Sequence, residues 1–369
     1  MPNPHSDYIK LLPDSVFLPT CFVDEERQLF DGTSLQPALK QKLQSLEEEF
    51  ALLQKHTSDV PWCQENWWRE EDGVGPQIIS NDWVYVDALY RSRTLDVPRL
   101  GPAMIPYMDM VNHASQNQAQ TRYEVGEDGR VALQLLPNTS LSIGEEVTMT
   151  YGENKGTAEM VFSYGFLEPS MTTAKVILLD LDIPDDDPLR PVKKRVCKAA
   201  PNVRLLVTSQ GEYEWESQAI WWSCVNEEDG LEFQLIQQTD GQRQLDVLWK
   251  GSLLDHSDLS TLLMDDPQRD VYLLRATVLL QTRVDQQLKE LEAAASASSS
   301  GKHSQAPVRS QVRDLAQRLK ELESAFLQAF HKHLEDQVGK SALPRRYVTC
   351  HFPLLTKVCR RHNCSRVLL

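Results

Sequence analysis

The stretch "DMVNHAS", residues 109–115, places an Asn–His pair directly after the apolar approach "GPAMIPYMDMV". Amide and imidazole side chains are costly to bury unless hydrogen bonds satisfy them. Two interpretations are open from the residues alone: Asn112 and His113 cap the end of a strand, or they contact a bound molecule. Hydrophobic periodicity does not distinguish the two.

Short strands and turns are predicted around this pair. "TRYEV" and "VALQLL" flank "GEDG", which is typical of a hairpin, and "EEVTMTYG" alternates after a turn at Gly144. We therefore expect residues 103–152 to be mostly β, followed by a short helix over 156–163 and a stop at Pro169. Polar and aromatic side chains are dense here, either as satisfied core residues or as a site: Arg93, Asp109, Asn112, His113, Tyr123, Tyr151, Tyr164 and Phe166.

Helical periodicity dominates on both sides of this region. Apolar residues at three- and four-residue steps predict a helix over 34–55, capped by Thr33 or Ser34. A second helix is expected after Asp82, with Pro98 as its end. Two long helices are predicted beyond Pro267, paired antiparallel and joined by a flexible loop at about 293–307. Before them, "LEFQLIQ" and "RQLDVLW" predict a hairpin around Asp240–Gly241.

Chain length, net charge and cysteine content limit the classes of function that the protein can have. A chain of 369 residues is long enough for two domains, and its formal charge of −15 argues against a nucleic-acid binder and favours a basic protein partner. No apolar stretch is long enough for a bilayer, and no signal peptide is recognisable, so we expect no membrane association and a cytosolic or nuclear location. Seven cysteines without a dense framework indicate reduced thiols.

Taken together, "DMVNHAS" and "SIGEEVTMTYGENKGTAEMVFSYGFLEP" (142–169) resemble the C-terminal half of the SET domain. The similarity is to the branch typified by the large-subunit Rubisco methyltransferases, with an "RSR" helix, "D-x-x-NH", "GE-x-V-x-x-x-Y" and "YGF-x-x-P", and it covers about residues 83–170. It implies an α+β fold: a β-rich SET core over 1–170 with a helical insert at about 30–97, and a mainly helical C-terminal substrate-binding domain over 171–369.

The resemblance implies transfer of a methyl group from S-adenosylmethionine to a lysine of a basic protein, such as a histone, ribosomal protein or translation factor. Such a reaction depends on positioning and electrostatics, so His113 as a general base is the less favoured alternative. Residue by residue, the resemblance assigns catalysis to Tyr151 and cofactor contacts to Asn112, His113 and Arg93. It assigns substrate contacts to Ser92, Asp109, Tyr123, Tyr164 and Phe166.

The sequence also departs from the SET pattern. A glycine-rich turn should precede the helical insert, yet the "GVG" at 73–75 lies inside the insert, where we interpret it as a surface turn. We therefore expect part of the cofactor pocket to be lacking, in either a shortened form of an active enzyme or an inactive SET-derived interaction module. Thr157 replaces the Asn usual in this branch, which is expected to alter a hydrogen bond.

We expect no metal site. "NHAS" lacks the cysteine that histone-type SET enzymes use for zinc, and no cysteine cluster follows "YGF". The terminal group of Cys350, Cys359, His362 and Cys364 matches no common zinc spacing, and a basic amphipathic helix is the plainer interpretation.

Overall fold

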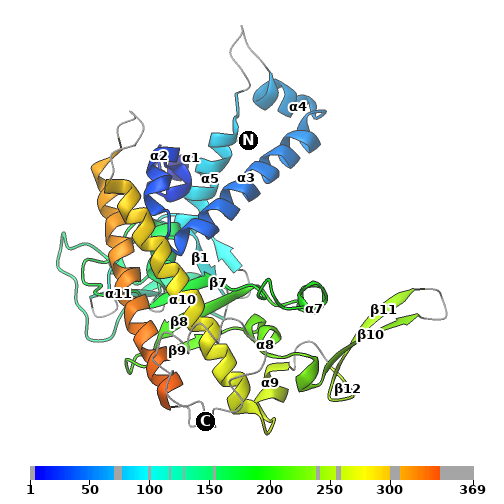
Figure 1. Ribbon diagram of the computed structural model, residues 1–369. Coiled ribbons are helices and arrows are strands. Elements are labelled where there is room, and N and C mark those ends of the chain that lie inside the picture. Colours follow the sequence, from blue (N-terminus) through cyan, green and yellow to red (C-terminus); the bar gives the residue numbers. More distant parts are fainter. Residues whose placement is uncertain are drawn as a thin grey trace. The chain divides into compact units, whose positions relative to one another are not determined.

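A computed structural model of the chain shows a mixture of helices and strands, which confirms the α+β class (Figure 1). The chain forms two compact units, one from Met1–Lys175 with Ala293–Glu323 and one from Val176–Glu292 with Ser324–Leu369. Within the described residues, no helix has the combined length and hydropathy needed to cross a bilayer. The structure describes residues 5–69, 77–98, 101–115, 118–127, 129–152, 155–237, 242–254, 259–299 and 308–340.

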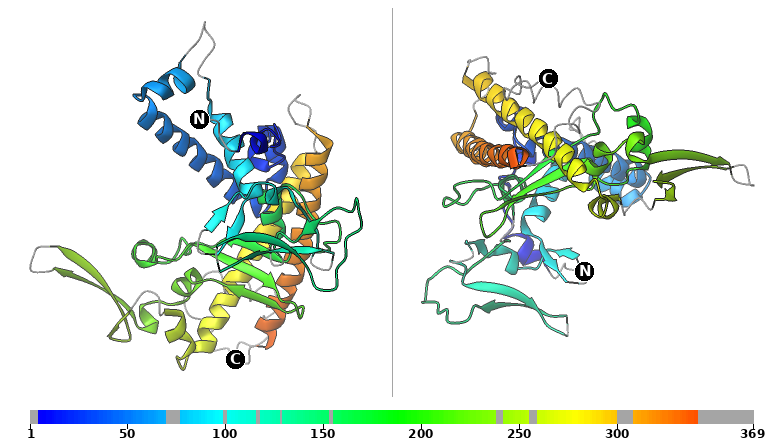
Figure 2. Two further views of the ribbon diagram at one scale, coloured as in Figure 1. Left: turned by 180° about the vertical axis from the view of Figure 1, so that it is seen from behind. Right: turned by 60° about the horizontal axis from the view of Figure 1, so that its bottom comes forward.

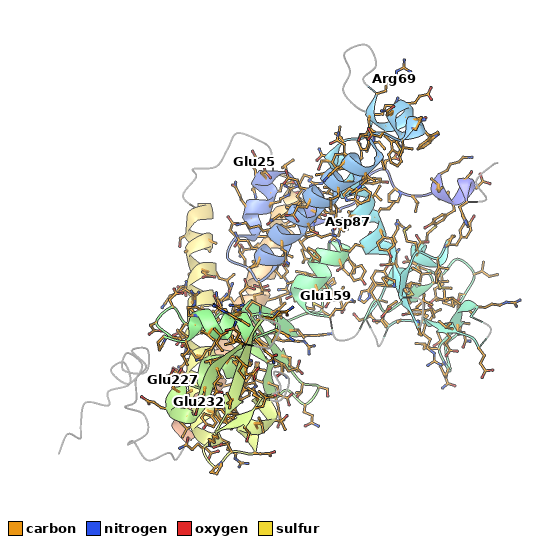
Figure 3. The ribbon with its side chains drawn as sticks, turned by 90° about the vertical axis from the view of Figure 1, so that its right-hand side faces the viewer. Glu25, Arg69, Asp87, Glu159, Glu227 and Glu232 are labelled. Carbon is orange, nitrogen blue, oxygen red and sulfur yellow. The ribbon has the colours of Figure 1, made fainter. Side chains whose placement is uncertain are left out.

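Two helices dominate the N-terminal part of the first unit. Helix α3 (Leu35–Thr57) confirms the helix predicted over 34–55, and α5 (Ser80–Arg93) packs against it. Lys42 of α3 and Asp87 of α5 form an ion pair at 2.7 Å, and Figure 3 shows Asp87 beside α3. The shorter elements here are α1 (Ser6–Ile9), η1 (Pro19–Cys21), α2 (Asp24–Arg27), η2 (Gln28–Phe30), α4 (Pro61–Cys63) and η3 (Gln64–Trp68).

Helix α5 ends earlier than the sequence predicted. It stops at Arg93, and Leu95–Val97 forms β1, which pairs antiparallel with β2 (Gly101–Ala103). The helix does not reach Pro98, because the residues before the proline gain strand hydrogen bonds. Asp82 lies in the first turn, where its carboxylate accepts the Ile79 N–H at 2.8 Å. Arg93 therefore marks the junction of helix and strand.

The central sheet has the order β3–β6–β4–β5. Its β4 (Thr121–Val125) and β5 (Val131–Leu135) pair antiparallel and confirm the predicted hairpin. The short strands β3 (Asn112–His113) and β6 (Thr148–Met149) pair in parallel, with His113 opposite Met149. Residues 103–152 contain less strand than predicted, since turns and η4 (Met108–Met110) take up much of the region.

Helix α6 (Thr157–Tyr164) follows as predicted and ends on Gly165, whose φ of 75° is left-handed. A Cβ at this glycine would lie 1.8 Å from the Phe17 carbonyl oxygen, so no larger residue fits. The core beneath α6 joins the N-terminal elements to the first half of α11 (Ser310–Lys340). Its buried members are Phe22, Phe30, Leu35, Val161, Val312, Ala316 and Leu319.

In the second unit, strands precede the long helices. The predicted hairpin is confirmed as β10 and β11, while Asp240–Gly241 lies outside the described residues. Helix α10 (Arg269–Ser299) extends into the stretch 293–307 that we expected to be a loop; residues 300–307 are not described. The strands and short helices are β7 (Val176–Asp180), α7 (Arg190–Val196), β8 (Asn202–Val207), β9 (Tyr213–Glu216), α8 (Ala219–Cys224), η5 (Glu227–Asp229), β10 (Leu231–Gln237), β11 (Arg243–Trp249), β12 (Ser252–Leu253) and α9 (Leu259–Met264).

The helices predicted beyond Pro267 are confirmed as α10 and α11. They run side by side in opposite directions in both views of Figure 2. Within the second unit, the pairing includes a contact of 2.8 Å between His331 Nε2 of α11 and Asp285 Oδ1 of α10.

Candidate active site

A cavity of about 330 Å³ in the first unit collects most of the predicted site residues. Its wall comes from the end of α5, from β1, β2, η4, β4 and β6, from the segment after β6 and from α6. The predicted residues on this wall are Arg93, Asp109, Tyr123, Tyr151 and Tyr164; the predicted residues not on it are Ser92, Asn112, His113 and Phe166.

Tyr151 is the centre of a cluster of rings. Its ring centroid lies 4.7 Å from that of Tyr164 and 6.5 Å from that of Phe166. The Tyr151 hydroxyl donates to the Val111 carbonyl at 2.8 Å, which leaves its oxygen lone pairs available as acceptors. Burial, reinforced by the neighbouring Tyr164, raises the pKa of Tyr151 to about 12. The hydroxyl is therefore neutral at physiological pH.

His113 holds the chain around Tyr151. The Tyr151 backbone N–H donates to His113 Nδ1 at 3.1 Å, so Nδ1 carries no proton. The proton of the neutral ring then sits on Nε2, which faces Glu168 Oε1 at 3.1 Å. Ser115 Oγ donates to the other Glu168 oxygen at 2.6 Å. Burial of Glu168 opposes its ionisation, but these two hydrogen bonds outweigh it and lower the pKa of Glu168.

Asp109 is a buried carboxylate with one oxygen filled and one open. Oδ2 accepts the Tyr8 hydroxyl at 2.8 Å and Arg93 Nη1 at 3.1 Å. The Asp109 side chain is 0% exposed, and Oδ1 has no hydrogen-bond partner among the described residues. A buried acceptor without a partner is unfavourable in an isolated chain. At a cavity wall, it is suited to a ligand that brings an N–H or O–H group.

The other predicted residues have partners within the chain. The Asn112 amide donates to Glu146 at 2.6 Å, and Tyr123 donates to the Asp96 carbonyl at 2.9 Å. Ser92 Oγ donates to the Leu89 carbonyl at 3.3 Å, as expected for a helix interior. Their assigned roles in binding cofactor and substrate stay predictions.

Sequence reasoning missed three residues that shape the site: Tyr8, Lys155 and Glu168. Tyr8 lies 101 positions from Asp109, so no local pattern could have paired them. Glu168 sits inside the quoted "YGFLEP" stretch but gave no signal of its own. Lys155 was detectable as the partner of Glu159, four residues later, with which it forms an ion pair at 2.5 Å.

The structure describes only some of the residues at which the sequence departs from the SET pattern. Thr157 is fully buried, and its hydroxyl has no hydrogen-bond partner in the described part of the chain. The "GVG" at 73–75 and the terminal Cys350, Cys359, His362 and Cys364 lie outside the described residues. Across the ranges that are described, His, Cys, Asp and Glu side chains form no group of three suited to a metal ion.

Known proteins resemble the chain in sequence. A fission yeast (Schizosaccharomyces pombe) "SET domain-containing protein 8" is 30% identical over 285 residues, covering 77% of this chain and 62% of that protein. The chloroplastic fructose-bisphosphate aldolase lysine N-methyltransferase of Arabidopsis thaliana is 26% identical, covering 49% of this chain and 37% of that enzyme. The chain thus spans less than two thirds of either relative. No family model matches the chain.

Solved structures resemble the chain in fold. A structure of Rubisco LSMT bound to AdoMet superimposes with a TM-score of 0.53 at 16% identity, covering 92% of this chain and 72% of that one. The SET domain of LSMT bound to lysine and AdoHcy gives 0.53 at 17% identity, with the same coverage. The chain is therefore similar in sequence to a SET-domain protein, and it shares its fold with the SET-domain structures of Rubisco LSMT.

Proposed function

We propose that the chain transfers a methyl group from S-adenosylmethionine to a lysine side chain of a basic protein. The observation that carries the proposal is a cavity lined by the mutually tilted rings of Tyr151 and Tyr164 and by Asp109, whose Oδ1 has no hydrogen-bond partner among the described residues. Two relatives support it, since the Arabidopsis protein and a tobacco (Nicotiana tabacum) relative at 25% identity are both named as N-methyltransferases.

The residues fit a cofactor that carries an ammonium group, because Asp109 lines the cavity and its Oδ1 has no donor within the part of the chain that the structure describes. Arg93, Asn112 and His113 are the residues that would hold S-adenosylmethionine. When bound, the cofactor supplies an electrophilic methyl group on a sulfonium. No metal is needed for this chemistry.

The tyrosines would position the incoming amine. A free lysine has a pKa of about 10.4 and must lose its proton before it can attack. The Tyr151 hydroxyl already donates to Val111, so its oxygen accepts an N–H from the amine and turns the nitrogen lone pair away from itself. The faces of Tyr151 and Tyr164 hold the alkyl stem and tolerate a cationic product. Orientation, rather than a general base, then provides the rate enhancement.

The substrate class follows from charge. A formal charge of −15 favours a basic partner such as a histone, ribosomal protein or translation factor. We further propose a cytosolic or nuclear location, which rests on the sequence alone.

The test is a cofactor titration followed by an assay of methyl transfer. Calorimetry is expected to detect S-adenosylmethionine binding, and labelled methyl groups are expected to appear on a histone and ribosomal-protein mixture. Tyr151→Phe should slow transfer about 100-fold through lost orientation of the amine. Tyr85→Phe is the matched control, because Tyr85 also donates to a backbone carbonyl, that of Pro13, but does not line the cavity.

Failure to bind S-adenosylmethionine would reject the enzyme in favour of the inactive interaction module. Equal rates for Tyr151→Phe and the parent would reject the role of Tyr151.

A further inference from the structure

Lys155 places a cation on the wall of the tyrosine-lined cavity. Its Nζ lies 5.6 Å from the centroid of the Tyr164 ring. Its stem lies over Gly152, where a Cβ would come within 2.9 Å of Lys155 Cε; Gly152 has a φ of +138°, which other residues rarely adopt. The ammonium is therefore held in place by the stem as well as by its polar contacts.

The counter-ion of Lys155 is Glu159, which is not part of the cavity wall. Lys155 Nζ and Glu159 Oε1 are 2.5 Å apart, but the Lys155 side chain is 26% exposed and that of Glu159 is 49% exposed. Glu159 lies on α6 (Figure 3). It does not line the cavity, whereas Lys155 does. Burial lowers the pKa of Lys155, but the hydrogen bonds to Glu159 and Tyr164 outweigh it, so the pKa is raised. The ammonium thus stays charged at neutral pH, on a side chain that lines the cavity.

The other two cations on the wall have partners of their own. Arg93 pairs with Asp109 at 3.1 Å, and Arg91 pairs with Asp87 at 3.1 Å. Asp96, on β1, is exposed. Burial raises the pKa values of Tyr123, Tyr151 and Tyr164, so these rings are uncharged.

We propose that Lys155 is a resident cation that disfavours the protonated form of an amine in this cavity. A like charge nearby lowers the pKa of an incoming ammonium, because two cations repel in a partly desolvated site. The lysine substrate would then be held as the neutral amine, the form that can attack a methyl donor. The inference rests on the proposed function for its ligand, and it makes Lys155 a positioning residue that sets the charge state of the nucleophile.

The test measures the pKa of a bound amine directly. The probe is Nα-acetyl-L-lysine N-methylamide labelled with ¹³C at Cε, titrated with pH by NMR in the presence of the full chain. In the parent, the bound amine is expected to titrate below its pKa in solution. Lys155→Met should raise the bound pKa by about one unit, while Lys155→Arg, which keeps the charge, should match the parent.

A purely structural role would weaken binding equally at every pH and leave the bound pKa unchanged. Identical bound pKa values in Lys155→Met and the parent would overturn the proposal, as would a lack of probe binding to all three proteins. Failure of the proposed function looks different: the probe binds with its pKa set by residue 155, yet no methyl group is transferred. Conversely, methyl transfer with the same pH profile in Lys155→Met and the parent would reject this inference alone.

Discussion

Asp109 in the first unit and Lys193 in the second are both buried charged residues, but their hydrogen-bonding capacity is filled to different degrees. Lys193 is 0% exposed and donates to Asp187 at 2.5 Å, the Val225 carbonyl at 2.7 Å and Asn226 Oδ1 at 2.9 Å. Every ammonium proton therefore has an acceptor. Asp109 uses Oδ2 for Tyr8 and Arg93, while its Oδ1 has no hydrogen-bond partner among the residues that the structure describes. A buried charged group whose hydrogen bonds are all made within the protein stabilises the fold. A buried charged group on a cavity wall with an unused acceptor can bind a ligand.

The largest effect is expected from breaking the filled network. Lys193→Met would leave the Asp187 carboxylate, 1% exposed, without its counter-charge, and should lower the free energy of unfolding by about 3–5 kcal/mol. Chemical denaturation monitored on the second unit measures the loss. Lys194→Met is the matched control: Lys194 is 44% exposed and pairs with Asp182 at the surface, so its loss should cost under about 1 kcal/mol.

The double variant Lys193→Met/Asp187→Leu separates pairing from packing. Removing both charges should recover much of the lost free energy, because no buried charge is left alone. A Lys193→Met variant no less stable than Lys194→Met would contradict a supporting role for the network.

Glu323 shows a third way to bury an ionisable group, and it makes stability depend on pH. Glu323 is 0% exposed and accepts the Ser34 N–H at 2.9 Å and the Ser34 hydroxyl at 2.6 Å. Burial raises the pKa of Glu323 to about 7. The folded protein thus binds this proton at a pH where the unfolded chain, with a pKa of about 4.3, has lost it.

The contribution of Glu323 to stability is complete below the unfolded pKa and is lost as pH rises through about 7, up to about 4 kcal/mol in all. Unfolding free energies measured from pH 4.5 to 8 should show this fall. Glu323→Gln, which is uncharged, should flatten the profile. Glu321→Gln, on a side chain that is 54% exposed, should leave it unchanged; a fall of the same size in Glu323→Gln would assign the pH dependence to another group.

A smaller effect on stability is expected from Asp109→Asn, which tests whether Asp109 Oδ1 binds a ligand. Asp109→Asn keeps an acceptor for Tyr8 but removes the charge, so the free energy of unfolding should fall by about 1 kcal/mol. Affinity for S-adenosylmethionine, measured by calorimetry, should fall by at least about tenfold if Oδ1 accepts the cofactor's ammonium group. Tyr8→Phe, which leaves the carboxylate charged, should change affinity less. Equal affinities of Asp109→Asn and the parent would make Asp109 a supporting residue like Lys193.

The features predicted correctly from the sequence are those set by interactions between residues close together in the chain. The β4–β5 hairpin and helices α3 and α6 were predicted correctly, because their turns, caps and apolar spacing lie within a few residues. Tyr151 was singled out only by the resemblance to the SET domain; it lines the cavity, and its catalytic role stays a prediction.

The missed features are tertiary. Tyr8 reaches Asp109 only because the chain brings together positions 101 apart, and α5 stops at Arg93 because Leu95–Val97 pairs with β2. Which oxygen of Asp109 remains open, and which nitrogen of His113 carries the proton, depend on partners that no local pattern identifies.

The smallest effect is expected at Thr157. It tests whether a buried hydroxyl without a hydrogen-bond partner, away from the cavity, only destabilises the fold. Thr157 is fully buried, lies off the cavity wall, and has a hydroxyl without a partner in the described residues. Thr157→Val keeps the shape and removes that hydroxyl, so the free energy of unfolding should hold or rise by up to about 1 kcal/mol. Thr277→Val is the matched control, because the buried Thr277 hydroxyl donates to the Leu273 carbonyl at 2.8 Å and its loss should cost about 1 kcal/mol. Equal losses in both variants, measured by chemical denaturation, would show that the Thr157 hydroxyl is satisfied in solution and that an open group need not indicate a ligand.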